Sequence, residues 1–271
     1  MTEKNNNITP TNLPFGATEG GITYGLIGFP LKHSFSSKYF TEKFEKEGIE
    51  AEYLNFEIED ILQIREVIIF NQRLRGLNVT IPYKEQVIPF LHEISPKAKE
   101  IGAVNVIRID RLPNDMYNHK LTGYNTDYIG FKKSIEPLIR PEIHKKALVL
   151  GTGGASKAVT HALTDLGLDC KYVSRTSGEN RFTYADLTQE IIDEYKIIIN
   201  ASPVGTFPKT DECPDIPYQF LSQHHLLYDL VYNPAETFFL KKGKSQGATI
   251  KNGAEMLQLQ AEAAWEIWAE K

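Results

Sequence analysis

The sequence predicts an α/β fold in two domains. Apolar, β-rich strands alternate with segments of helical periodicity from Tyr24 onward. A chain of 271 residues is also long enough for two packed domains. In the second half, the glycine-rich loop 151–156 directly follows an apolar strand and opens a helix, which is the context that a nucleotide-binding loop requires. The second domain is therefore expected to be Rossmann-like.

In the first half, strands are expected where short apolar runs end at turn-forming residues, and helices where apolar residues recur at helical spacing. Gly28 stops the first strand, Gly48 closes the first helix, and Pro96 fits the first turn of a short helix. In order, the elements are strand 24–28, a helix through Phe40 and Phe44, strand 52–56, helix 61–70, strand 77–81, a short helix from Ser95, and strand 103–107.

The second half repeats the alternation with longer β-rich runs. Strands are expected over 147–150, 171–174, 196–200 and 226–229, and such continuous runs are typical of a parallel sheet that is covered on both faces. Helix 156–166 lies between the first two strands, which makes a β-α-β unit with a right-handed crossover. The tail from Gly253 is helical and is expected to pack back on the first domain.

These elements set the expected domain limits. Residues 1–21 are polar and read as a loosely ordered N-terminal leader. The first domain should span 22–124 and include the C-terminal helices of 252–271. The dinucleotide-binding domain should span 125–251.

Composition narrows the classes of partner. A net charge of −5 argues against a nucleic-acid or anionic-membrane surface, and no apolar run is long enough to span a bilayer. Cys170 and Cys213 form no C-x-x-C pattern, which favours a reducing cytoplasm. The seven histidines show no metal-ligand spacing, so no metal is expected. The oligomeric state stays open between a monomer and a homodimer.

The glycine-rich loop departs from G-x-G-x-x-G at one position. Gly151 and Gly153 fill the first two positions, and Ser156 stands at the third, where a small residue still allows close packing of helix on strand. Backbone N–H groups and the helix dipole would hold a pyrophosphate there. The alternative is a tight turn that binds no ligand.

The type of dinucleotide can be inferred one strand later. About 20 residues beyond the loop, an NAD-binding domain usually places Asp or Glu against the ribose. This chain has Arg175 there, between Ser174 and Thr176, and a guanidinium pairs with a 2′-phosphate that a carboxylate would repel. NADP is therefore favoured over NAD, and the alternative for Arg175 is an ordinary solvated arginine.

The strand 77–81 leads directly to residues that can take part in a reaction. Lys84 offers a movable proton, while Asn78 and Thr80 offer neutral hydrogen bonds to a small oxygenated molecule. Asp127 supplies a carboxylate further on. With a dinucleotide site, this set points to a small-molecule oxidoreductase. The alternatives are that Lys84 is a surface lysine at a helix start and that Asp127 only caps a helix.

Two serines follow the first strand. Ser34 and Ser36 alternate on a polar loop, so their hydroxyls would point the same way and bind a carboxylate. The alternative is a polar turn without a ligand.

Taken together, the ordered motifs resemble those of the shikimate dehydrogenase family, from Tyr24 to the C-terminus. The motifs are Gly28-Phe-Pro30 with Lys32-His-Ser34-Phe-Ser36; Asn78-Val-Thr80-Ile-Pro82-Tyr-Lys84; Gly102-Ala-Val-Asn105; Asn125-Thr-Asp127; Gly151-Thr-Gly153-Gly154-Ala-Ser156; Ser174-Arg175-Thr176; Asn200-Ala-Ser202-Pro-Val-Gly205; Asp229-Leu-Val-Tyr232-Asn-Pro234; and Asn252-Gly253 with Met256-Leu257 and Gln260-Ala261.

The resemblance implies an N-terminal substrate domain and a C-terminal NADP-binding domain separated by a cleft, and the NADPH-dependent, reversible reduction of 3-dehydroshikimate to shikimate in the chorismate and aromatic amino-acid pathway. It implies that Lys84 and Asp127 are the catalytic pair. The substrate residues would be Ser34 and Ser36 with Tyr232 at the carboxylate, and Asn78, Thr80, Asn105 and Gln260 at ring hydroxyls. The cofactor residues would be Gly151, Gly153, Gly154, Ala155, Ser156, Ser174, Arg175, Thr176, Ser202, Leu230, Gly253 and Met256.

Two departures from the family pattern keep alternatives open. Glu179 stands where a second basic residue is expected, with Arg181 two positions on, and the stretch from Thr176 to Tyr195 is short, as if a helix were trimmed. A quinate/shikimate dehydrogenase with broader substrate and NAD(P) use is therefore the main alternative. A ligand-sensing paralogue without turnover is a further one, although it would have no need of Lys84 and Asp127.

Overall fold

The computed structural model describes residues 7–8, 21–31, 34–111 and 119–270, and these divide into two compact units. One comprises the chain up to Thr126 together with the stretch from Ala261, and the other is Asp127–Gln260. The domain limits expected from sequence stay a prediction. Most of the expected leader, 1–21, lies outside the described residues, but Asn7–Ile8 forms strand β1, which pairs with β3.

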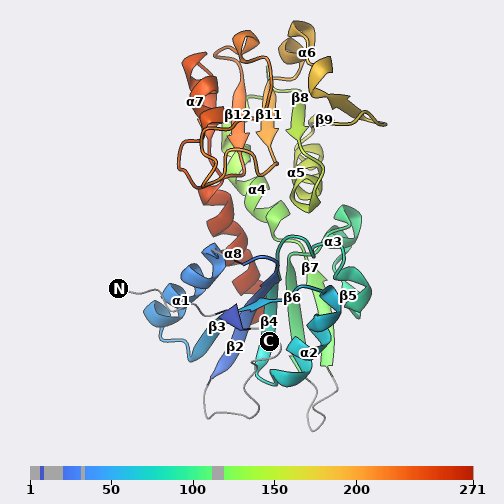
Figure 1. Ribbon diagram of the computed structural model, residues 1–271, viewed down its shortest axis with the longest axis vertical. Coiled ribbons are helices and arrows are strands. Elements are labelled where there is room, and N and C mark those ends of the chain that lie inside the picture. Colours follow the sequence, from blue (N-terminus) through green and yellow to red (C-terminus); the bar gives the residue numbers. More distant parts are fainter. Residues whose placement is uncertain (1–6, 9–20, 32–33, 112–118, 271) are drawn as a thin grey trace. The chain divides into compact units, whose positions relative to one another are not determined.

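The first unit is built on a mixed seven-stranded sheet with the strand order β1-β3-β2-β4-β6-β7-β5 (Figure 1). The strands β1 to β4 pair in parallel, whereas β6 is antiparallel to both of its neighbours. The remaining strands are β2 (Ile22–Gly28), β3 (Ala51–Glu57), β4 (Leu74–Val79), β5 (Glu93–Ile94), β6 (Val106–Arg111) and β7 (His119–Tyr124). The strand expected over 103–107 was thus placed too early, and β7 was not predicted.

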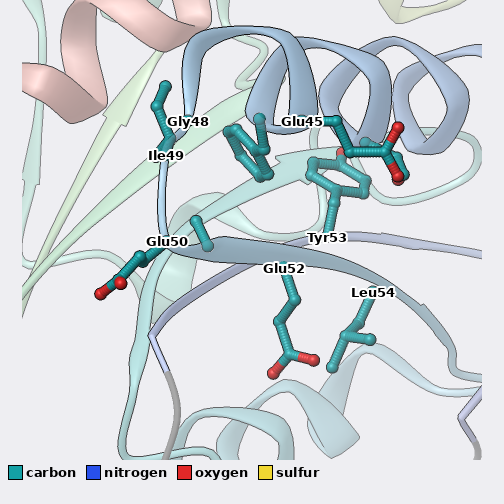
Figure 2. A pocket seen from close by; sticks show the side chains of 10 residues that line it. Glu45, Gly48, Ile49, Glu50, Glu52, Tyr53 and Leu54 are labelled. Carbon is teal, nitrogen blue, oxygen red and sulfur yellow. The ribbon is translucent and has the colours of Figure 1, made fainter.

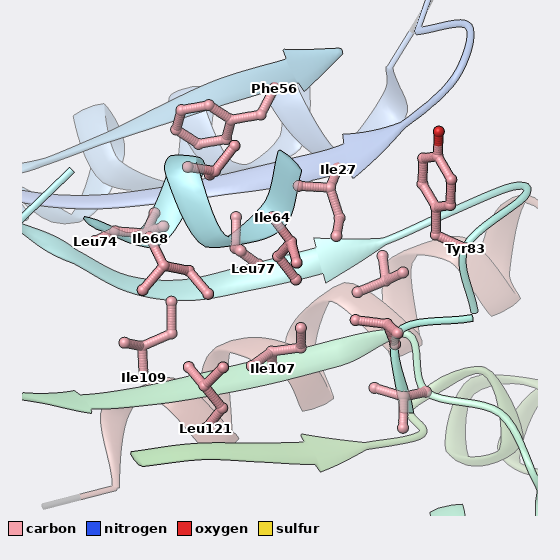
Figure 3. Packing of buried hydrophobic residues seen from close by; sticks show 14 of the residues in the cluster. Ile27, Phe56, Ile64, Ile68, Leu74, Leu77, Tyr83, Ile107, Ile109 and Leu121 are labelled. Atoms are coloured by element: carbon pink, nitrogen blue, oxygen red, sulfur yellow. The ribbon is translucent and has the colours of Figure 1, made fainter. Parts of the chain in front are cut away.

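Alternate side chains of this sheet enter two separate cores. On one face, Ile27 and Leu77 pack with residues of the short helix α2 (Ile64–Phe70), as Figure 3 shows. On the other face, Tyr24 and Tyr53 pack with α1 and with the end of α8. The other helices of this unit are α1 (Phe35–Glu47), α3 (Pro96–Ile101) and the 3₁₀ turns η2 (Ile61–Gln63) and η3 (Ile88–Phe90).

The second unit contains a six-stranded sheet, and every pair of neighbouring strands in it is parallel. Its order is β10-β9-β8-β11-β12-β13, so the chain winds outward from β8 in one direction and then outward from β11 in the other. This is the doubly wound Rossmann order, which confirms the expected fold class. The strands are β8 (Lys146–Leu150), β9 (Asp169–Ser174), β10 (Arg181–Thr183), β11 (Ile197–Asn200), β12 (Leu226–Asp229) and β13 (Thr249–Lys251).

Helices cover both faces of the parallel sheet. Phe131, Val159 and Met256, from α4, α5 and α8, share one core, while Ile192 and Phe239, from α6 and α7, share the other. The elements are α4 (Asp127–Ile135), η4 (Glu136–Leu138), α5 (Gly154–Asp165), η5 (Tyr184–Asp186), α6 (Gln189–Glu194), η6 (Tyr218–Phe220), α7 (Phe238–Ser245) and α8 (Ala254–Ala269). The segments β10, β13, α6 and α7 were not predicted. Among the described helices, none is long and apolar enough to cross a membrane.

The connection between β9 and β10 is unusually short for parallel neighbours. Residues 175–180 join them without a helix, although parallel strands ordinarily need a crossover of about a dozen residues. Gly178 and Arg181 form an isolated bridge inside this stretch. The sequence looked as if a helix were trimmed, and the missing helix is the one that would ordinarily connect β9 to β10.

Two buried histidines of the second unit are held in one tautomer. The Ser222 N–H donates to Nδ1 of His225 (3.0 Å), so Nε2 carries the proton and donates to the Ile192 carbonyl (2.9 Å). His144 is arranged alike, between the Arg140 N–H (3.0 Å) and the His224 carbonyl (3.1 Å). Burial lowers the pKa of both imidazoles.

This arrangement predicts loss of stability in mild acid. Because the folded-state pKa of each histidine lies below its unfolded value of about 6.5, the folded chain binds fewer protons. The contribution is fully present above that value and is lost as the pH falls through it. Urea unfolding at several pH values between about 5 and 8 should show it. His225→Asn should weaken the dependence of the free energy of unfolding on pH, and an unchanged dependence would contradict the assignment.

Candidate active site

The glycine-rich loop has the backbone geometry of a pyrophosphate site. Gly151 follows β8 with a φ of +107°, a left-handed conformation that favours glycine, and its N–H donates to the Val173 carbonyl (2.9 Å). Gly153 is the N-cap of α5, so the N–H groups of Gly154 and Ala155 belong to the first helical turn and have no acceptor within the helix. A phosphate at this end would meet backbone donors and the positive end of the helix dipole.

Ser156 fits the third position of the motif. Its side chain is fully buried, and Oγ donates to the Gly153 carbonyl at 2.6 Å. The hydroxyl is thus satisfied within the first turn of α5, and the residue stays small enough for the helix to pack on the sheet. This is why serine can replace the glycine of the usual motif here.

The end of β9 carries no carboxylate in the expected ribose position. Ser174 Oγ donates to the Thr176 carbonyl (2.8 Å) and accepts from the Thr176 N–H (3.3 Å), which closes a tight turn around Arg175. The Arg175 side chain is exposed. Arg181 is half-buried, and its Nε has no hydrogen-bond partner among the described residues. The residues in place therefore fit a 2′-phosphate better than a 2′-hydroxyl.

A buried polar network joins the ends of β11 and β12, next to the glycine-rich loop. The Asn200 amide donates to Asp229 (3.0 Å) and to the Val204 carbonyl (3.1 Å), and its Oδ1 accepts from Ser202 Oγ (2.6 Å). Asp229 also accepts from Thr237 Oγ1 (2.6 Å). Burial raises the Asp229 pKa to about 6, although these hydrogen bonds oppose the shift. The network holds the loop that carries Ser202.

The loop after β12 is fixed by the same carboxylate. The Val231 N–H donates to Asp229 (3.0 Å), and the Leu230 N–H donates to the Asn200 carbonyl (2.9 Å). Gly253, at the start of α8, donates its N–H to the Val231 carbonyl (3.2 Å). Leu230 and Gly253 are thus brought to one edge of the sheet with Ser202. Asn200 and Asp229 appear in the sequence motifs, but their structural role was missed because it depends on two strands that are distant in the sequence.

Asp127 and Gln260 also belong to the second unit, on α4 and α8. Asp127 is the first residue of α4 and is buried. Gln260 is buried as well, and its Nε2 donates to the Leu257 carbonyl (3.0 Å). Tyr232, in contrast, is 39% exposed.

In the first unit, the expected substrate residues gather where β2 and β4 end. Asn78 lies in β4 and is buried, and the Thr80 N–H donates to the Ile27 carbonyl (2.9 Å). The Asn105 carbonyl accepts from the Val79 N–H (2.8 Å), which ties the start of β6 to the same edge. The Asn105 side chain donates to Thr126 Oγ1 (3.0 Å) and accepts from the Thr126 N–H (2.7 Å).

The surroundings of Lys84 differ from the expectation. Residues 81–87 form a succession of turns before η3, so Lys84 does not lie at the start of a helix. Its backbone carbonyl accepts from the Val104 N–H at 2.7 Å. The half-buried lysine is therefore anchored beside Asn105 by its main chain, in the same unit as Asn78 and Thr80.

The serine pair is placed differently from a polar loop. Ser34 is the N-cap of α1, where its Oγ accepts from the Ser37 N–H (3.1 Å), and Ser36 lies in the first helical turn. The two hydroxyls are therefore not aligned by alternation along an extended loop. Instead, both lie at the start of α1, and hydroxyls and N–H groups at a helix N-terminus favour an anion.

A cavity of about 490 Å³ lies at the opposite end of α1 (Figure 2). It is lined by Glu45, Glu50 and Glu52 and by residues of β3. None of the expected substrate or cofactor residues lines it, so we do not identify this acidic cavity with the active site. No cluster of three or more possible metal ligands occurs in the part of the chain that the structure describes.

Comparison with known proteins agrees with this geometry. The family model described as "Shikimate dehydrogenase substrate binding domain" matches residues 26–107. Shikimate dehydrogenase (NADP(+)) of Clostridium beijerinckii is 41% identical over 259 residues, which cover 91% of this chain and 92% of the relative. The crystal structure of the Aquifex aeolicus shikimate dehydrogenase is 35% identical, with a TM-score of 0.79 over 92% of each chain.

A third relative was solved with ligands. The shikimate 5-dehydrogenase of Listeria monocytogenes, in complex with shikimate and NAD, is 29% identical, with a TM-score of 0.80 over 93% of this chain and 92% of that one. The sequence relatives cover nearly the whole chain at identities well above 30%, and the doubly wound unit has the order that a dinucleotide domain requires. The chain belongs to the shikimate dehydrogenase family.

Proposed function

We propose that this protein is an NADP-dependent shikimate dehydrogenase that interconverts 3-dehydroshikimate and shikimate. Family membership supports the reaction class, and the single observation that carries the proposal is the gathering of Asn78, Thr80, Lys84 and Asn105 at one edge of the first unit. NADPH would supply the hydride for the ring ketone. The residues of the chain must then bind the substrate, hold it and deliver a proton.

In this proposal Lys84 delivers the proton. Reduction of a ketone develops negative charge on its oxygen, and the Lys84 ammonium can donate to that oxygen as the alkoxide forms. Asp127 is proposed as the second member of the catalytic pair, where it supplies a carboxylate. In the reverse direction, Lys84 accepts the proton of the shikimate hydroxyl.

The substrate is held by neutral donors and acceptors. Ser34 and Ser36 at the start of α1 would bind the carboxylate, helped by Tyr232. Asn78, Thr80, Asn105 and Gln260 would bind the ring hydroxyls.

Arg175 is proposed to bind the 2′-phosphate of NADP. Arg175→Ala should raise the KM for NADP at least tenfold while it changes the KM for NAD by less than about twofold, since only NADP loses a charge-assisted hydrogen bond. Initial rates at saturating shikimate would measure both constants. Arg175→Lys keeps the charge, so its KM for NADP should lie between those of the wild type and the alanine variant. Equal losses for both cofactors would show that Arg175 does not contact the phosphate.

The alternative of a broader quinate/shikimate dehydrogenase rests on the β9–β10 connection. Glu179 lies on that helix-free stretch, where a second basic residue was expected. Initial rates with shikimate or quinate, each against NADP or NAD, separate the two. Activity confined to shikimate with NADP supports the proposal, activity with quinate or NAD supports the broader enzyme, and no activity in all four leaves a ligand sensor.

We further propose a reducing cytoplasm as the compartment. Cys170 and Cys213 are both free thiols, and Cys170 is buried. Small molecules are the only partners that the proposal requires.

A further inference from the structure

The last residues of β11 and β12 form a buried polar pair. The two strands lie side by side, and Asn200 and Asp229 are partners in their parallel register, so their side chains share one face of the sheet (Figure 1). The Asn200 amide donates to Asp229 Oδ1 at 3.0 Å, and both residues are fully buried. Any effect of this pair on a ligand must therefore pass through the residues that it holds.

Asp229 is a buried carboxylate without a cationic partner. It forms no salt bridge with any residue that the structure describes. Its oxygens accept instead from the Asn200 amide, from the Val231 N–H (3.0 Å) and from Thr237 Oγ1 (2.6 Å). Because a buried charge costs stability unless hydrogen bonds compensate it, these three donors are what Asp229 is there to hold.

The direction of the hydrogen bonds in this network is fixed by groups that can only donate or only accept. Asn200 Nδ2 donates to the Val204 carbonyl (3.1 Å) and to the ionised Asp229, and both of these only accept. Asn200 Oδ1 accepts from the Ser202 N–H (3.1 Å), which only donates. The Ser202 hydroxyl must then donate to the same Oδ1, at 2.6 Å.

This leaves the Ser202 hydroxyl as an acceptor toward a ligand. A hydroxyl has one proton and two lone pairs, and the proton of Ser202 is committed to Asn200. The Val204 N–H approaches one lone pair at 3.4 Å, and the other is left for a ligand, which can reach this half-buried residue. Ser202 can therefore accept from a hydroxyl or an amide N–H, but it has no proton for a phosphate oxygen.

The topology assigns this acceptor to one half of the dinucleotide. The switch point of the sheet lies between β8 and β11. The glycine-rich loop and Arg175 follow β8 and β9, so the adenosine half belongs to that side. A doubly wound sheet binds one mononucleotide on each side of the switch point, which places the nicotinamide nucleoside at the ends of β11 and β12. Its ribose hydroxyls and its carboxamide are donors.

A second loop on the same side is held by the same carboxylate. The Val231 N–H donates to Asp229, and the Val231 carbonyl accepts from the Gly253 N–H at 3.2 Å. A Cβ at Gly253 would overlap the Leu230 carbonyl oxygen, so the start of α8 fits closely against this loop. Asp229 thus holds both loops that carry proposed cofactor residues on the nicotinamide side.

We propose that Asp229 is a positioning residue for the nicotinamide half of the cofactor, and that, through Asn200, it holds the Ser202 hydroxyl as an acceptor for a donor group of the nicotinamide nucleoside. This inference rests on the proposed function, because it takes NADP as the cofactor. It adds a residue too buried to contact the cofactor itself.

The test compares NADP with adenosine 2′,5′-bisphosphate, which lacks the nicotinamide half, by calorimetry. Asp229→Asn keeps one acceptor oxygen but loses charge-assisted bonds, so the Kd for NADP should rise about threefold. Asp229→Ala loses all three bonds and should raise it at least tenfold. The Kd for adenosine 2′,5′-bisphosphate should stay within about twofold in both variants. If the alanine variant does not fold, the asparagine variant decides alone.

Tyr228→Phe is the matched control. Tyr228 precedes Asp229 in β12, packs in the opposite core and shares a buried hydrogen bond with Ser134 Oγ (2.7 Å). The variant should lower the melting temperature and leave both Kd values unchanged. Equal changes for the two ligands in the Asp229 variants, no change for either, or the same split in Tyr228→Phe would overturn the inference and leave a structural role.

Ser202→Ala tests the acceptor. It should raise the Kd for NADP about fivefold, which corresponds to about 1 kcal/mol, and leave that for adenosine 2′,5′-bisphosphate unchanged. An unchanged Kd for NADP would overturn the assignment. The acetylpyridine analogue of NADP has no carboxamide N–H. A fivefold effect that persists with this analogue assigns the donor to a ribose hydroxyl, and one that disappears assigns it to the carboxamide.

The outcomes separate this inference from the proposed function. A wild type that oxidises shikimate, with Asp229 variants that bind NADP as it does, overturns the inference alone. A wild type that binds NADP without oxidising shikimate overturns the function, and the Kd values then decide the inference. A wild type that neither binds NADP nor oxidises shikimate overturns both.

Discussion

Lys84→Ala should lower kcat by about two to four orders of magnitude, the usual contribution of a positioned general acid. Without the ammonium, the developing alkoxide has no proton donor from the chain at that point. The fold should survive the change, because the main chain at Lys84 is held independently by the Val104 N–H at 2.7 Å. The Kd for NADP should therefore stay close to the wild-type value, since all the proposed cofactor residues lie in the second unit.

Two further variants separate charge from proton transfer. Lys84→Arg keeps a positive charge but cannot release a proton near neutral pH, so it should stay nearly as slow as the alanine variant. Lys99→Ala removes an exposed lysine of α3 in the same unit and should leave kcat unchanged. Steady-state rates of shikimate oxidation would give kcat for Lys84→Ala, Lys84→Arg and Lys99→Ala. Near-normal turnover in Lys84→Ala would exclude the lysine as the proton donor.

Trp268→Ala should lower the free energy of unfolding by about 3–5 kcal/mol, the range for removing a large buried aromatic side chain. The indole stacks on Tyr24, with centroids 4.9 Å apart, and lies 5.2 Å from the Phe40 ring. Its Nε1 donates to the Ile107 carbonyl at 3.0 Å. Since the side chain is 6% exposed, the variant would leave a cavity and lose this hydrogen bond.

Urea unfolding would measure this loss, and graded variants would separate its parts. Trp268→Phe keeps an aromatic ring but lacks the donor to Ile107, so it should lose less than the alanine variant. Gly76→Ala should also destabilise, because a Cβ at Gly76 would overlap the Trp268 indole. Trp265→Ala, at a half-buried position of the same helix, should cost less. Equal losses for Trp265→Ala and Trp268→Ala would contradict the argument.

Strands and helices with a strong local pattern could be predicted from the sequence. The β-rich run of β8, the glycine-rich loop and α5 were found because their signal is contiguous in the chain. The strands β10 and β13 were missed because each has only three residues and is stabilised by pairing with a neighbouring strand, which a local pattern does not record. Lys84 lies among turns, whereas one interpretation of the sequence placed it at a helix start.

By itself, the sequence determined the α/β class, the Rossmann character of the second unit and the residue types that carry the chemistry, because these follow from periodicity and from motifs a few residues long. Only the tertiary structure decided how those side chains are held. Tyr53 donates to Asn78, and Asn200 donates to Asp229, through hydrogen bonds between residues that are 25 and 29 positions apart in the chain. Such contacts depend on strand register and on which face of a sheet a helix covers, and no short stretch of sequence specifies either.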